Sequence, residues 1–122
     1  MTTDWTAYLN GLTPGLKGLR GGQPDVMAGF SAIAKAALKP GALDSKSKEL
    51  IALGISVATR CDDCIGFHMK AAIEKGASRE EIMETMGMAI YMGAGPSVMY
   101  AAHAVTAFEQ FSEGTKTPTA KP

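Results

Sequence analysis

The chain has 122 residues, of which 46% are hydrophobic and 20% are charged, the balance of an ordinary globular protein. Lys and Arg together number 12, as do Asp and Glu, so the formal net charge is zero. A nucleic-acid-binding protein shows a basic excess and a basic patch, which are missing here, so nucleic acid is not expected as a partner. The length predicts a single domain, near the size at which subunits often gain stability by association.

The compartment follows from the absence of targeting signals. No basic segment followed by an apolar stretch opens the chain, so we expect no secretory signal and a cytoplasmic location. The longest uncharged run, Thr85 to Phe108, is broken by Gly, Pro and His and predicts a buried helix pair, not a membrane span. A lasting structural disulfide is not expected in the cytoplasm, so two cysteines spaced C-x-x-C point to redox or metal chemistry.

Helical periodicity recurs along the chain without strand signals, which predicts an all-α bundle of about five or six helices. Residues 1–22 are expected to form a short docking helix or segment. Residues 23–111 are expected to form the helical redox domain, and the Thr/Lys/Pro-rich residues 112–122 a disordered tail. The helix start and stop signals are Pro24, Pro40-Gly41, Asp44 or Ser45, the break at 60–63, Gly76, the capping box Ser78-x-x-Glu81, and Gly93-Ala94-Gly95-Pro96.

The cysteine pair lies where a helix is expected to begin. With a start near Asp62, Cys61 and Cys64 are neighbours at i, i+3, and Cys64 and His68 are neighbours at i, i+4. Unpaired backbone N–H groups and the helix dipole favour the thiolate, the nucleophilic form, and His68 can exchange a proton with it. Asp62 and Asp63 act in the opposite direction, unless their charges are used as N-caps or to pair with Arg60.

Glu49, about three turns before the cysteines, is the next candidate. A partly buried carboxylate there can accept a proton from a thiol directly, or through His68 and water. The alternative is a solvated glutamate paired with a nearby lysine.

The cysteines have alternatives too. One is a pair of buried, inert thiols. Another is half of a zinc site completed by His68 and His103, although His103 is distant in the sequence and its alanine neighbours suit a core histidine.

Glu49, then eleven residues, then Cys61-x-x-Cys64-x-x-x-His68, resembles the active-site signature of alkyl hydroperoxidase D in the carboxymuconolactone decarboxylase-like superfamily. The resemblance runs from about Pro24 to Phe111. It implies a thiol peroxidase or disulfide reductase in which Cys64 attacks the peroxide, Cys61 resolves the sulfenic acid, and Glu49 and His68 relay protons. The alternative activity is a thiol redox sensor, or a zinc-binding protein, without turnover.

The resemblance also sets expectations about partners. It implies a hydroperoxide substrate, an external lipoyl-type or thioredoxin-like dithiol reductant, a peroxiredoxin as a downstream partner, and assembly as a homotrimer or homohexamer. No cofactor or metal is expected. The family pattern commonly has histidine just before the second cysteine, where this chain has Asp63. The decarboxylase branch lacks the cysteine pair, so lactone decarboxylation is not expected.

Overall fold

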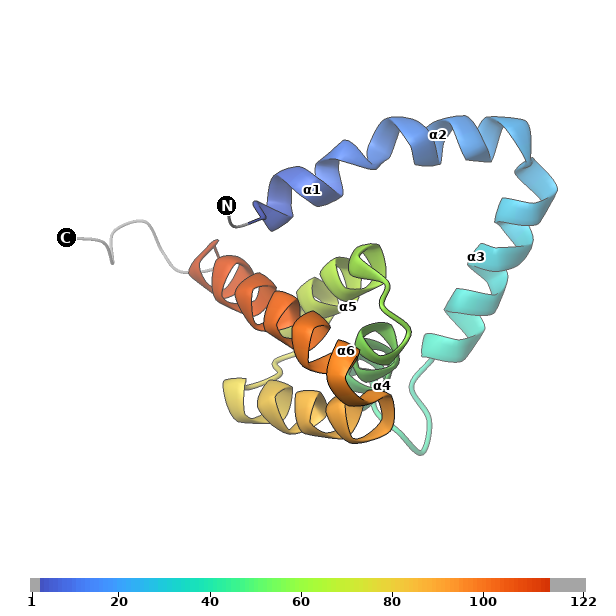
Figure 1. Cartoon of the computed structure of the whole chain (residues 1–122). Coiled ribbons are helices and arrows are strands. Elements are labelled where there is room, and N and C mark those ends of the chain that lie inside the picture. Colours follow the sequence, from blue (N-terminus) through green and yellow to red (C-terminus); the bar gives the residue numbers. More distant parts are fainter. Residues whose placement is uncertain (1–2, 115–122) are drawn as a thin grey trace.

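The computed structural model describes residues 3–114, which form six helices and no strand (Figure 1). The helices are α1 Trp5–Gly11, α2 Thr13–Gly22, α3 Pro24–Leu38, α4 Ser45–Ala58, α5 Asp62–Glu74 and α6 Arg79–Gly114. The prediction of an all-α domain is therefore confirmed. Within residues 3–114, no helix combines the length and the apolar character needed to cross a membrane.

Helices α4, α5 and α6 pack together and form the core. Its fully buried members include Leu53 on α4, Ile65 and Met69 on α5, and Ile82 on α6, all at 0% exposure. Local signals set the helix starts. The Asp44 carboxylate caps α4 by accepting from the Ser47 N–H at 2.7 Å. The capping box predicted before α6 is present, with reciprocal bonds between Ser78 and Glu81 of 2.8 and 3.1 Å.

Helix α6 is kinked at the predicted Gly-Ala-Gly-Pro cluster. Ala94 has φ 60° and ψ −147°, which divides α6 into two helical segments. A Cβ on Gly93 would lie 1.9 Å from the Ser97 Oγ, so this close approach requires glycine. The second segment extends to Gly114, so residues 112–114 are helical and do not belong to the expected tail. The remainder of that tail, 115–122, lies outside the described residues.

The first three helices form an arch that stands away from the core (Figure 1). Of the three, only α1 buries side chains against the core, with Trp5 and Leu9 exposed by 2% and 7%. Helices α2 and α3 bury no residue. The expected docking segment 1–22 therefore docks through its first helix alone.

Candidate redox site

A tight helix ending places the first cysteine. Arg60 adopts a left-handed conformation with φ 61° after α4. The Cys61 N–H donates to the Ser56 carbonyl at 3.0 Å, and the Arg60 N–H to the Val57 carbonyl at 3.1 Å, the two bonds of a Schellman motif. The chain thus passes from α4 to α5 in three residues, Thr59 to Cys61, and Cys61 becomes the N-cap of α5.

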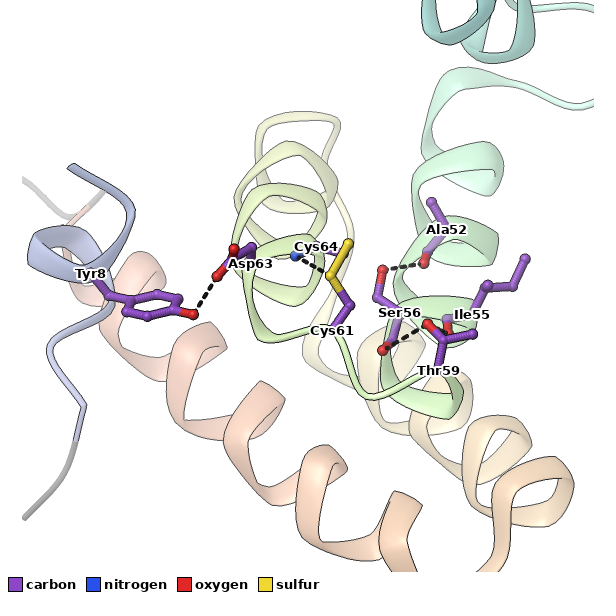
Figure 2. Close-up of a disulfide and its surroundings, with 8 residues drawn as sticks. All are labelled: Tyr8, Ala52, Ile55, Ser56, Thr59, Cys61, Asp63 and Cys64. Carbon is purple, nitrogen blue, oxygen red and sulfur yellow. Dashed lines mark hydrogen bonds between the residues drawn. A yellow bond between two sulfur atoms is a disulfide. The ribbon is translucent and has the colours of Figure 1, made fainter. Parts of the chain in front are cut away.

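Cys61 and Cys64 are joined by a disulfide, with their Cα atoms 5.2 Å apart. The Cys61 Sγ also accepts from the Cys64 N–H at 3.2 Å, so its sulfur fills the capping role that an oxygen usually fills. Figure 2 shows the disulfide on the side of α5 that faces Ser56 and Ala52 of α4. The structure therefore holds the pair in its oxidised form, at the positive end of a helix.

Glu49 and His68 are hydrogen-bonded across α4 and α5. The His68 Nδ1 lies 2.7 Å from the Glu49 Oε1, and Glu49 is only 7% exposed. With Glu49 ionised, Nδ1–H donates to it, which leaves Nε2 for proton exchange. The alternative of a solvated glutamate paired with lysine is wrong, because this carboxylate is buried and its partner is histidine.

Helices α4 and α5 meet along faces that carry the candidate redox residues. Cys64 and His68 are one turn apart on α5, while Glu49 and Ser56 are two turns apart on the face of α4 that packs against it. Cys61, at the N-cap of α5, lies beside Ser56, so the structure brings all four predicted residues, Cys61, Cys64, His68 and Glu49, to the α4–α5 contact. Their catalytic roles stay a prediction, since geometry alone does not measure turnover.

The two aspartates between the cysteines have partners that the sequence did not indicate. The Tyr8 hydroxyl on α1 donates to the Asp63 Oδ1, and the His103 Nδ1 on α6 lies 3.3 Å from the Asp62 Oδ1. The hydrogen bond to Asp63 raises the pKa of Tyr8 from 10.0 to about 12, with burial and the charges of Asp63 and Asp62 acting in the same direction. The expectation that these aspartates cap the helix is wrong, because Cys61 occupies that position.

His103 is neither a core residue nor a ligand beside the cysteines. Its side chain is 49% exposed and faces Asp62. Among residues 3–114 no group of three or more His, Cys, Asp or Glu side chains is arranged to hold a metal ion. The zinc alternative therefore gains no support from the geometry.

A second surface feature lies apart from these residues. An open apolar groove of about 450 Å³ runs between α4 and the first segment of α6, and none of the four candidate redox residues lines it. Its lining includes Leu50, Ile51, Ile55, Met88 and Met92.

A sequence model of the Carboxymuconolactone decarboxylase family matches residues 24–107. The chain belongs to this family. The family match covers α3, α4, α5 and α6 as far as residue 107, hence all four candidate redox residues, and it excludes α2 and α1 with Tyr8.

Relatives and solved structures agree with the family. An uncharacterized protein of Cupriavidus necator is 38% identical over 109 residues, which are 89% of this chain and 96% of that protein. A family protein from Legionella pneumophila, solved in its apo form, matches with 51% identity and a TM-score of 0.85, over 88% of this chain and 96% of that one. A family protein from Thermotoga maritima, described as "possibly involved in antioxidative response", matches with 31% identity and a TM-score of 0.79, over 87% and 91% of the two chains.

Proposed function

We propose that this protein is a cysteine-based reductase of organic hydroperoxides that cycles between a dithiol and the Cys61–Cys64 disulfide. The supporting observation is a bonded cysteine pair at a helix start, one turn from a histidine that a buried glutamate orients. Family membership and the description of the Thermotoga maritima protein point in the same direction.

The first step is attack of the Cys64 thiolate on the terminal peroxide oxygen. The O–O bond breaks, sulfur is oxidised to a sulfenic acid, and the alkoxide leaves. His68 supplies the proton that converts the alkoxide to the alcohol, and Glu49 stabilises the imidazolium before that transfer.

In the second step the Cys61 thiol gives up its proton and its thiolate attacks the Cys64 sulfur, which forms the disulfide; the S–O bond breaks, and the hydroxide that leaves takes up that proton as water. An external dithiol, of a lipoyl or thioredoxin type, then reduces the disulfide by exchange and is itself oxidised. During this exchange the Cys61 sulfur is the better leaving thiolate, because the Cys64 N–H donates to it. A cytoplasmic location, where dithiol reductants are maintained, suits this cycle.

The test uses reduced protein and about one equivalent of an organic hydroperoxide. We expect loss of both thiols and a mass decrease of about two hydrogens, with one alcohol formed per disulfide. Cys64→Ser should abolish alcohol formation, whereas Cys61→Ser should stop at a trappable sulfenic acid. If the disulfide forms but added lipoyl-type or thioredoxin-type dithiols give no repeated reduction of hydroperoxide, the protein is a redox sensor. If both thiols survive the hydroperoxide, the proposal is refuted.

We propose, in addition, that the chain assembles with copies of itself as a homotrimer or homohexamer. Two unpartnered apolar surfaces support this. One is the apolar face of α3, where Val26, Phe30 and Ile33 are 63–65% exposed, and the other is the α4–α6 groove. Monomeric proteins rarely leave contiguous apolar surfaces of this kind uncovered. A peroxiredoxin remains a proposed downstream partner.

A further inference from the structure

Helix α1 approaches the redox helix α5 most tightly at a glycine, Gly66. A Cβ on Gly66 would lie 2.7 Å from the Leu9 Cδ2 and 3.2 Å from the Trp5 Cε3. Only glycine therefore lets α1 approach α5 this closely, one turn beyond Asp62 and Asp63. The N-terminal end of α1 is also tied to α6, because the Trp5 N–H donates to the Gln110 Oε1 at 2.8 Å.

This docking brings Tyr8 to the segment between the two cysteines. Figure 2 shows the Asp63 side chain extending toward Tyr8 and away from the disulfide. The Tyr8 hydroxyl donates to the Asp63 Oδ1. Because its pKa of about 12 keeps Tyr8 protonated, the hydroxyl is a permanent donor at neutral pH.

The direction in which the Asp63 carboxylate points affects how readily the cysteine thiols ionise. A carboxylate close to a thiol disfavours the thiolate, and the effect weakens as the charge moves away or accepts a hydrogen bond. The two other carboxylates near the pair have different partners: His103 on α6 faces Asp62, and His68 faces Glu49 on α4. Arg60 is the cation next to Cys61 in the chain, and Tyr8→Phe leaves it in place. Asp63 is thus the carboxylate in the C-D-D-C segment whose position depends on α1.

We propose that Tyr8 is a positioning residue for the redox pair, holding the Asp63 carboxylate turned away from the cysteines so that the Cys64 thiolate forms more readily when α1 is docked. This inference rests on the proposed redox role of the pair. It gives the N-terminal helix, which lies outside the family match, control over the reactivity of a site built entirely from α4 and α5.

The experiment compares Tyr8→Phe with Tyr91→Phe, a matched loss of one hydroxyl at a residue 78% exposed on α6. The thiolate fraction of the reduced protein is titrated by ultraviolet absorbance, and alkylation by a neutral thiol reagent is timed at neutral pH. We expect Tyr8→Phe to raise the apparent thiol pKa by about half a unit and to slow alkylation by about threefold. Tyr91→Phe should change neither quantity.

Two further variants separate positioning from a structural effect. In the Asp63→Asn background, Tyr8→Phe should no longer shift the titration, because the charge it holds has been removed. Gly66→Ala, which displaces α1 while retaining Tyr8, should shift the titration in the same direction as Tyr8→Phe.

An unchanged titration in Tyr8→Phe would overturn the proposal, and so would an equal shift in the Asp63 and Asp63→Asn backgrounds. These measurements use no peroxide, so they are independent of turnover. If the wild-type protein fails to reduce hydroperoxides but Tyr8→Phe still shifts the thiol titration, the proposed function fails and the positioning role stands.

Discussion

Helices α3 and α4 both carry an apolar stripe, but the stripe is buried on α4 and exposed on α3. On α4, Leu53 and Val57 are completely buried against α5 and α6, whereas on α3 Phe30 and Ile33 are 65% exposed. A helical stripe of apolar residues predicts that the helix has a partner. It does not say whether that partner belongs to the same chain.

The arch that contains α3 is fixed at both ends. Trp5 and Leu9 bury α1 against the core, and the Lys48 Nζ donates to the Ala37 carbonyl at 3.0 Å near the C-terminal end of α3. In this arrangement α3 does not line the α4–α6 groove of its own chain. A second copy is therefore the occupant that we propose for both apolar surfaces.

The largest expected effect on stability comes from comparing a substitution in the α4 stripe with one in the α3 stripe. Leu53→Ala should lower the free energy of unfolding by about 2–5 kcal/mol, because it leaves a cavity in the core. Phe30 is 65% exposed, so Phe30→Ala should cost little within the chain, and we expect it to lower the assembly mass seen by sedimentation and to destabilise mainly through lost association. If Phe30→Ala leaves both the mass and the melting temperature unchanged, α3 is not an interface.

Within the core, Glu49→Gln should lower the rate of hydroperoxide reduction by about a hundredfold, since the neutral amide no longer stabilises a charged His68. Stopped-flow kinetics with an organic hydroperoxide measures this rate, and circular dichroism checks that the helices persist. Glu80→Gln, at an exposed position on α6, serves as the control and should leave the rate unchanged. A rate equal to that of wild type in Glu49→Gln would remove Glu49 from the relay.

Replacing a glycine of α6 by alanine should change the stability of the protein in opposite directions at the kink and in the straight part of the helix. Gly93→Ala should destabilise the protein by about 1–3 kcal/mol, because the new methyl group meets the Ser97 Oγ. Gly87→Ala, where nothing lies within 4 Å of the new Cβ, should stabilise it by up to about 1 kcal/mol through helix propensity. Urea unfolding of both variants provides the comparison, and equal effects would show that the kink is not tightly packed.

The smallest expected effect concerns acid. Bonds from the Lys46 ammonium and then the Ser78 N–H lower the pKa of Glu81 below 4.5, so its contribution to stability is present above that pH and is lost as the pH falls through the folded-state pKa. Thermal melts should therefore show a slightly weaker dependence on acid in Glu81→Gln than in wild type. An identical acid dependence would show that Glu81 contributes nothing measurable.

Local signals in the sequence were sufficient for most of the fold. Three of these signals each involve only a few neighbouring residues, so a short stretch of sequence is enough to recognise them. They are the Asp44 cap, the capping box of Ser78 and Glu81, and the kink at Gly93 to Pro96. The spacing of Cys61, Cys64 and His68 likewise fixed their common location, because helical geometry relates neighbours three and four residues apart.

Long-range contacts were beyond such signals. Tyr8 and Asp63 are 55 residues apart, and His103 and Asp62 are 41 apart, so no pattern relates them. Glu49 was ambiguous for a similar reason, since a glutamate beside apolar residues is buried only if α5 covers that side of α4. The α3 stripe predicted a buried face, yet Phe30 and Ile33 are 65% exposed, because α3 packs so little against the rest of its own chain.

The docking of α1 gives the protein a built-in optical reporter. Trp5 is the only tryptophan in the sequence, and it is 2% exposed where it meets Gly66 of the redox helix and the Tyr8 ring, whose centroid is 5.6 Å away. Its fluorescence is therefore expected to shift to the red, as water reaches the indole, whenever α1 leaves α5. Fluorescence can thus follow, in the unlabelled protein and in real time, whether reduction of the disulfide loosens the N-terminal helix.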